Sequence, residues 1–101
     1  MKKLLIAAAL TVAATSAIAD TLALAKANAC LACHAMDRKL VGPAFKDVAA
    51  KYAGRKDAVE YLTAKIKNGG GGVWGAMPMP AQARLSEAQA KELAQWVLTA
   101  K

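Results

Sequence analysis

Two cysteines and a histidine stand together in Cys30-Leu31-Ala32-Cys33-His34, and the chain has no other cysteine or histidine. On a helical or tightly turned backbone, residues three and four apart lie on one side. Both thiols can then reach the two vinyl groups of one porphyrin, while the imidazole of His34 reaches its iron from one face. This is the spacing used to attach haem c covalently. The motif therefore predicts a haem site formed by Cys30, Cys33 and His34.

Three other interpretations of the motif explain fewer of its residues. A structural zinc site needs four nitrogen or sulfur ligands, and this chain supplies three at most. A thioredoxin-like Cys-x-x-Cys lies in a βαβ unit, for which the sequence shows no strand-like alternation. A structural disulfide between Cys30 and Cys33 stays possible, but it gives no reason for the adjacent histidine.

The first nineteen residues have the layout of a secretory signal peptide. Lys2-Lys3 gives a positive start, an apolar stretch follows, and Ala17-Ile18-Ala19 offers the small residues of a cleavage site. The apolar stretch is short and rich in alanine beside the ~20 residues that a spanning helix needs. We expect residues 1–19 to be cleaved, the mature chain 20–101 to have no transmembrane segment, and the protein to reach the bacterial periplasm.

The mature part of the chain comprises 82 of the 101 residues. This is one small domain, in which the polypeptide alone buries a modest core. Loss of the lysines at positions 2 and 3 lowers the net charge from +7 to +5. A basic chain often binds nucleic acid, but export argues against that partner. The positive charge would instead steer the protein toward acidic surfaces of partner proteins.

Apolar spacing throughout the mature chain predicts an all-α domain of about four helices. The first helix should run from about Thr21 to the haem motif, with one stripe formed by Leu22, Ala25 and Ala29. The second should follow Pro43, a residue suited to the first helical turn, and end near Gly54. Its apolar positions are Phe45, Val48, Ala49 and Tyr52.

The two remaining helices have clear start signals. Asp57 is expected to be the N-cap residue of the third helix, which ends at Asn68-Gly69 and whose apolar face holds Ala58, Tyr61, Leu62 and Ile66. Ser86 and Gln89 form a capping box for the last helix, beside a hydrophobic staple of Leu85 and Ala90. The apolar stripe of that helix comprises Leu93, Trp96, Val97 and Ala100.

A segment rich in glycine and proline separates these two helices. Four consecutive glycines, residues 69–72, precede a stretch that contains Gly75, Pro78 and Pro80, so regular structure is not expected there. We expect this loop to wrap over other parts of the molecule and to bury its large apolar residues, Val73, Trp74, Met77 and Met79.

An iron held by one histidine has an open sixth position, for which a methionine is the available ligand. Met36 is too close in sequence to His34 to reach the opposite face. Met77 and Met79 flank Pro78, whose rigid backbone would hold a thioether in place. Methionine in a small domain is usually core filler, so the pattern leaves both residues as candidates.

Six short segments spread along the mature chain carry a resemblance to a known family. They are Cys30–Ala35, Val41–Ala49, Ile66–Gly69, Gly72–Gly75, Pro78–Pro80 and Trp96–Leu98. Together they are similar to the bacterial class I monohaem cytochromes c of the cytochrome c-551 (cytochrome c8) type. The resemblance implies a small class I cytochrome c fold wrapped around one covalently bound haem c per chain.

The resemblance also implies a role for individual residues. Cys30 and Cys33 become the thioether attachments, His34 the proximal iron ligand and Met79 the distal one, while Met77 lines the pocket.

The same comparison extends to residues beside these ligands. The carbonyl of Pro43 would accept the Nδ1 proton of His34 and so fix the ring. Trp74 would donate its indole N–H to a haem propionate. Lys65 stands where an arginine often faces a propionate; it keeps the charge but lacks the bidentate fork.

A few positions depart from the family pattern. Gln82 stands where an asparagine often bonds near the methionine sulfur. Ala25 and Ala29 stand where an aromatic residue and a glycine often help the first helix cross the last. The segment that follows Met79 is one residue longer.

The implied function is electron transfer, not catalysis by an enzyme. A His/Met-ligated iron that cycles between Fe(III) and Fe(II) has no vacant position for a substrate, and methionine favours Fe(II). The resemblance implies a monomer that carries single electrons from a donor such as a membrane cytochrome complex to an oxidase, nitrite reductase or peroxidase. A labile Met79 would instead give a ligand-binding sensor or a weak peroxidase. Without haem, Cys30 and Cys33 would be a thiol–disulfide exchanger.

Overall fold

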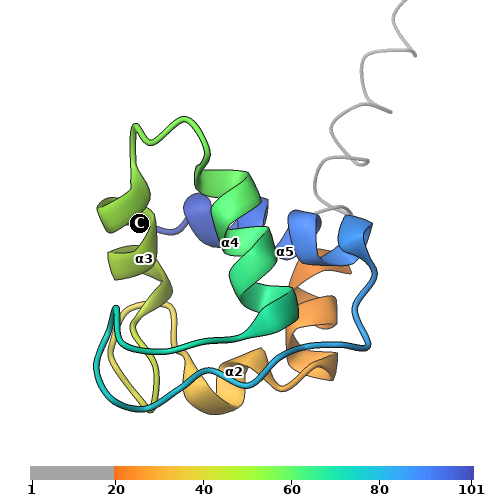
Figure 1. Ribbon diagram of the computed structural model, residues 1–101, viewed down its shortest axis with the longest axis horizontal. Helices are drawn as coiled ribbons and strands as arrows, with labels where there is room; N and C mark the ends of the chain where they lie inside the picture. Colours follow the sequence, from red (N-terminus) through yellow and green to blue (C-terminus); the bar gives the residue numbers. More distant parts are fainter. Residues whose placement is uncertain (1–19) are drawn as a thin grey trace, which may run out of the picture.

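The computed structural model describes residues 20–101, and the expected signal peptide, residues 1–19, lies outside this part. The described chain is helical at residues 20–27 and in α2 (Cys30–Cys33), α3 (Phe45–Tyr52), α4 (Ala58–Asn68) and α5 (Glu87–Leu98) (Figure 1). Its β pairing is limited to two isolated bridges, His34 with Lys39 and Gly70 with Met79. The predicted all-α class is confirmed. Between residues 20 and 101, every helix is too short or too polar to cross a membrane.

The first helix ends at residue 27, shortly before the Cys-x-x-Cys-His motif to which it was predicted to run, so the predicted stripe position Ala29 lies outside it. Residues 20–27 are helical, and the chain then turns at Asn28 and Ala29 before α2 begins. The turn depends on Ala29, whose φ of 58° places it in the left-handed region. Alanine gives no sequence signal for that conformation, which glycine and asparagine adopt far more easily. Ala29 is consequently exposed, whereas Ala25 is completely buried.

Helices α3 and α4 follow the predicted apolar positions closely. All four predicted residues of α3 are buried, and α4 buries Ala58 and Leu62. Two details differ from the prediction. Pro43 precedes α3 without joining it, because Ala44 occupies the N-cap position. The carboxylate of Asp57 makes no capping bond, because it is paired with the Arg55 guanidinium, whose Nη2 donates to Oδ2 at 3.1 Å.

The start of α5 has the predicted capping box. The backbone N–H of Gln89 donates to Ser86 Oγ at 3.1 Å, and the backbone N–H of Ser86 donates to Gln89 Oε1 at 3.0 Å. The staple residues Leu85 and Ala90 are both buried. Helix α5 packs against α4 and α3, and it lies behind α4 in Figure 1. The hydroxyl of Thr21 donates to the carboxylate of Glu92 at 3.0 Å, which ties residues 20–27 to α5.

The core consists of two clusters of buried side chains. One joins α3, α4 and α5 through Phe45, Val48, Tyr52, Ala58, Leu62, Ala94 and Val97. The other joins residues 20–27 to α5 and the segment before it through Ala25, Leu85, Ala90 and Leu93. Cys30, Ile66 and Trp96 pack against both clusters. The Cys-x-x-Cys-His motif is thus attached to the core through its first cysteine.

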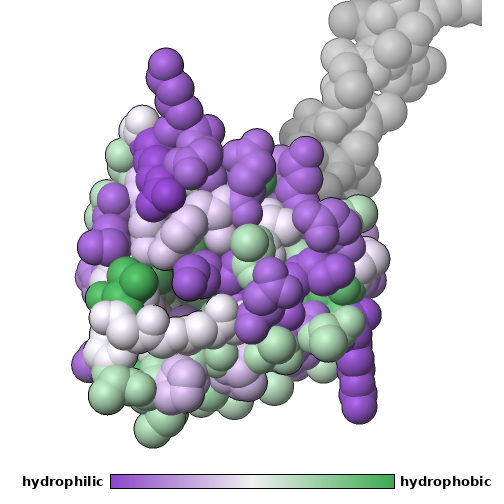
Figure 2. All heavy atoms as spheres, viewed as in Figure 1, coloured by the Kyte–Doolittle hydropathy of each residue, from purple (hydrophilic) through white to green (hydrophobic). Residues whose placement is uncertain are grey.

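The large apolar residues of the loop between α4 and α5 line a pocket, and their exposed fractions describe the polypeptide alone. Val73 is 48% exposed, Trp74 39% and Met77 69%, whereas Met79 is partly buried. These residues lie along the rim of a pocket instead of inside the packed core. On the face shown in Figure 2, pale and green residues cover much of the lower half, where this loop runs, and hydrophilic residues cover the upper half.

Candidate haem site

One pocket is lined by every residue that the sequence assigned to the site: Cys30, Cys33, His34, Pro43, Lys65, Trp74 and Met79. The space among the lining residues is about 1150 Å³, including the part that opens to solvent. Helices α3, α4 and α5 supply most of its apolar wall, with the side chains of Phe45, Val48, Leu62, Ile66, Leu93 and Val97.

His34 is held from three sides at the edge of this pocket. Its Nδ1 lies 2.7 Å from the carbonyl oxygen of Pro43. Because a carbonyl can only accept, Nδ1 carries the proton, and Nε2 is left with a free lone pair that can bind a metal. The imidazole also stacks on Phe45 with a centroid distance of 4.9 Å and an interplanar angle of 22°. A Cβ at Gly42 would lie 2.6 Å from Cε1 of the ring.

Gly42 and Phe45 thus belong to the site, although sequence analysis gave neither of them a role there. The backbone N–H of Gly42 donates to the carbonyl of Cys33 at 2.7 Å, which folds the chain back over the motif. The glycine directly before Pro43 was the available signal for this close approach. Phe45 offered no such signal, because its helical spacing was already explained by the core.

Both cysteines are half-buried on the single turn of α2, and no disulfide joins them. The backbone N–H of His34 donates to the carbonyl of Cys30 at 3.0 Å and closes this turn. Burial raises the pKa of the Cys30 thiol, the neighbouring Cys33 raises it further, and a backbone hydrogen bond acts in the opposite direction. Within residues 20–101, no three histidine, cysteine or carboxylate side chains converge closely enough to hold a metal ion among them.

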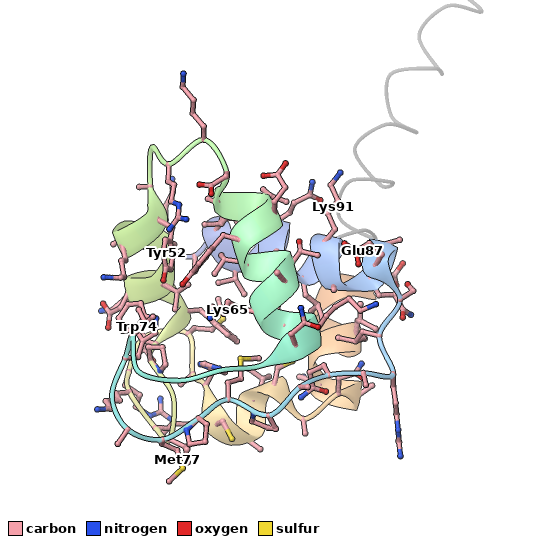
Figure 3. The ribbon with its side chains drawn as sticks, in the orientation of Figure 1. Tyr52, Lys65, Trp74, Met77, Glu87 and Lys91 are labelled. Atoms are coloured by element: carbon pink, nitrogen blue, oxygen red, sulfur yellow. The ribbon has the colours of Figure 1, made fainter. Side chains whose placement is uncertain are left out.

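Met79 is the better placed of the two candidate methionines. It is partly buried and lines the pocket, and its backbone pairs with Gly70 through hydrogen bonds of 2.8 and 3.0 Å. Met77 also lines the pocket but is mostly exposed, and Figure 3 shows its side chain pointing away from the helices. Met36 is absent from the pocket lining. For Gln82 the backbone N–H donates to the carbonyl of Ile66 at 2.9 Å.

Two tyrosines of the pocket wall were assigned only to helix cores by the sequence analysis. Tyr52 of α3 and Tyr61 of α4 have ring centroids 5.2 Å apart. Burial raises the pKa of the Tyr52 hydroxyl, and its contact with Tyr61 acts in the same direction. The ring of Tyr61 also lies 4.2 Å from Cζ of Arg55. This cluster closes one side of the pocket with aromatic surface and hydroxyl groups.

Cationic side chains border the same aromatic side. Nζ of Lys65 lies 5.6 Å from the ring centroid of Tyr61, and Nζ of Lys51 lies 5.5 Å from that of Trp74. Figure 3 places Tyr52 and Trp74 near each other, with Lys65 closer to the middle of the molecule. Ammonium groups beside an apolar pocket suit a ligand that is apolar over most of its surface and anionic at one edge.

The pocket residues fit haem c. The two thiols and the imidazole from one short segment line the same apolar space as a thioether from a distant loop, and the cations lie at its border. A flat apolar macrocycle with iron at its centre and two propionates at its edge matches this set of groups.

Comparisons with known proteins agree with this arrangement. The sequence profile of the cytochrome c family matches residues 18–101. Cytochrome c-552 of Hydrogenobacter thermophilus is 54% identical over 101 residues, which are the whole of both chains. Cytochrome c-552 of Nitrosomonas europaea is 58% identical over 78 residues, which cover 77% of this chain and 76% of that protein.

A solved structure supports the same relationship in three dimensions. The crystal structure of wild-type Nitrosomonas europaea cytochrome c552 superposes with a TM-score of 0.76 and 56% identity over 79% of this chain and 99% of that one. The chain therefore belongs to the cytochrome c family, as a class I monohaem member. Its cofactor is covalently bound haem c with its iron, and its role is in electron transport.

Proposed function

We propose that this protein is a periplasmic one-electron carrier in which Cys30 and Cys33 hold haem c through thioether bonds and His34 and Met79 bind its iron. The observation that carries the proposal is that one pocket is lined by all four side chains. Met79 comes from the loop between α4 and α5, whereas the other three residues lie in or directly after α2. Haem c bound there supplies one-electron exchange between Fe(III) and Fe(II).

The chain's own residues would contribute orientation and an apolar environment. The hydrogen bond from His34 to Pro43 fixes the imidazole plane and increases the basicity of Nε2. The apolar wall disfavours the more highly charged ferric state, so it acts with Met79 to raise the reduction potential. Trp74 and Lys65 are proposed to face the propionates, where Lys65 supplies charge and Trp74 a hydrogen-bond donor.

The ligand assignment is tested by replacing each candidate methionine in the haem-loaded protein. Met79→Ala should abolish the weak far-red absorption of a methionine–iron bond in the ferric protein, open the ferrous protein to carbon monoxide and lower the reduction potential. Met77→Ala is the matched control, since it removes the same side chain two residues away. Its spectrum should be that of the wild type.

Two outcomes would overturn the assignment. Loss of the far-red band in Met77→Ala, with the band intact in Met79→Ala, would move the ligand role to Met77. A wild-type protein that lacks the band and binds carbon monoxide readily would instead be a ligand-binding haem protein or a weak peroxidase.

The partners are proposed to be larger redox proteins in the periplasm or its membrane. Exposed apolar residues on the pocket rim, Val41, Val73 and Met77, give a surface suited to brief contacts. Arg38 and Lys39 lie in the same segment as Val41 and add positive charge. Electron-transfer contacts are typically small, and their association rates should fall as ionic strength rises if the partner surface is acidic.

Export is tested by the mass of the protein recovered from the periplasm. The expected species is residues 20–101 with one added haem. A chain that keeps residues 1–19, or that stays in the cytoplasm, would contradict the proposed location.

A further inference from the structure

The glycine run after α4 lies directly against the segment that carries Met79. Gly70 and Met79 exchange two backbone hydrogen bonds, with Met79 N–H to Gly70 O at 2.8 Å and Gly70 N–H to Met79 O at 3.0 Å. In Figure 1 the two segments run side by side across the lower front of the molecule. Met79 is therefore fixed through its main chain, independently of any contact of its side chain.

Close approach between these segments requires residues without a side chain. A Cβ at Gly69 would overlap the carbonyl oxygen of Met79 and lie 2.8 Å from the amide nitrogen of Ala81. A Cβ at Gly71 would lie 3.2 Å from Cα of Pro78. These atoms belong to backbone or to a proline ring, so they cannot rotate away as a flexible side chain would.

Both segments are anchored to the C-terminal end of α4. The N–H of Gly69 donates to the carbonyl of Lys65 at 2.8 Å, and the N–H of Gln82 donates to that of Ile66 at 2.9 Å. Ile66 packs against both core clusters. The position of Met79 is thus linked to the core through two short backbone connections, one on either side of it.

We propose that Gly69 and Gly71 are positioning residues that hold the main chain of Met79 at the distance from α4 at which its sulfur can bind the iron. The inference rests on Met79 being the distal ligand. It assigns to the glycine run a function beyond flexibility: the absence of side chains sets how deeply Met79 enters the pocket. A side chain at position 69 or 71 would push the methionine segment outward and weaken the iron–sulfur bond.

A control for backbone strain lies outside the pocket. Gly54 has a φ of +79°, so alanine there is strained, but a Cβ would meet nothing within 4 Å and the residue does not line the pocket. Gly69, with a φ of +71°, combines the same kind of strain with contact to the methionine segment. Gly71 makes such a contact without a positive φ. Backbone strain and displacement of Met79 can therefore be separated.

The experiment compares Gly69→Ala, Gly71→Ala and Gly54→Ala as haem-loaded proteins. The readouts are the far-red absorption of the ferric protein, the carbon monoxide affinity of the ferrous protein, the reduction potential and the melting temperature. For Gly69→Ala we expect about a tenfold gain in carbon monoxide affinity, equivalent to ~1.4 kcal/mol, with a weaker far-red band and a lower potential. Gly71→Ala should show smaller changes of the same sign. Gly54→Ala should lower the melting temperature alone.

The outcomes separate this inference from the ligand assignment. The ligand assignment stands if the wild type has the far-red band and Met79→Ala loses it. The positioning role is nevertheless refuted if Gly69→Ala and Gly71→Ala keep the spectrum, potential and carbon monoxide affinity of the wild type. Equal changes in the Gly54→Ala protein would also refute it, because strain alone would then be sufficient. If Gly69→Ala yields no folded protein, the comparison of Gly71→Ala with Gly54→Ala decides. A wild type without the band refutes the ligand assignment itself.

Discussion

Replacement of Gly42 by alanine should disturb His34, the proposed iron ligand, without straining the backbone. The new Cβ would lie 2.6, 2.9 and 3.2 Å from Cε1, Nδ1 and Nε2 of the imidazole. The ring cannot turn away freely, because Nδ1 is bonded to Pro43 on one side and the ring face is stacked on Phe45. To make room, it must give up one or both of these contacts.

The size of the effect follows from the contacts that are lost. A hydrogen bond contributes ~0.5–1.5 kcal/mol and an aromatic stack a further ~0.5–1.5 kcal/mol. We therefore expect Gly42→Ala to lower the free energy of unfolding by about 1–3 kcal/mol. In a domain of this size each kcal/mol lowers the melting temperature by ~4–8 °C, which a thermal melt of the haem-loaded protein would resolve.

The reduction potential should respond in a definite direction. Loss of the bond to Pro43 makes Nε2 of His34 a weaker donor, which disfavours Fe(III) and raises the potential. If the bond to Pro43 stabilises Fe(III) relative to Fe(II) by its whole free energy, its loss shifts the potential by about 20–60 mV. This is an upper bound. Spectroelectrochemical titration would measure the shift.

A matched substitution separates this effect from a general loss of stability. Gly54 has a φ of +79° and open space around it, so Gly54→Ala should lower the melting temperature and leave the potential unchanged. A Gly42→Ala protein with the melting temperature and potential of the wild type would refute the reasoning. It would mean that the ring adjusts to the methyl group at no cost.

Other substitutions test the elements that hold the site. Ser86→Ala removes the capping box and should cost about 1 kcal/mol, seen as a lower melting temperature; an unchanged melt would contradict the cap. Leu85 is 3% exposed and lies outside the pocket lining. Leu85→Ala should therefore lower the free energy of unfolding, measured with denaturant, by ~2–5 kcal/mol. An altered haem spectrum would contradict a purely structural role for this residue. Ala29→Gly should raise the melting temperature, because the left-handed backbone costs alanine ~1–2 kcal/mol. The greater conformational freedom of glycine in the unfolded chain offsets part of this gain in stability. The Arg55 side chain lowers the pKa of Asp57. The stabilising effect of this pair is therefore present above the unfolded pKa of ~3.9 and is lost as the pH falls through the folded pKa. Asp57→Asn should make stability less dependent on pH in this acidic range, and identical acid titration curves for the two proteins would refute this.

The helices were predictable because each depends on signals within a few residues. The buried stripe of α3 repeats at helical spacing, and the capping box of Ser86 and Gln89 is entirely local. The Cys-x-x-Cys-His motif could likewise be interpreted directly, since the chemistry needs those atoms at that spacing. The pairing of this motif with Met79 required the family resemblance, because about 45 residues of chain separate them.

Features that depend on tertiary contacts, or on competition between neighbouring side chains, were not predictable. The left-handed turn at Ala29 is imposed on a residue that gives no local signal for it. Asp57 had the right type and place for a cap, but Arg55 competes for its carboxylate. The stack of Phe45 on His34 and the contact between the rings of Tyr52 and Tyr61 arise only when separate segments are brought together.

The contribution of α5 to both halves of the core bears on how the protein matures. This last helix supplies Leu93 to one buried cluster and Ala94 and Val97 to the other, and it receives the hydrogen bond from Thr21 near the start of the described chain. In the proposed export with the N-terminus first, the polypeptide cannot complete either cluster until its final residues have crossed the membrane. Throughout that interval the two thiols stay accessible for attachment to the porphyrin.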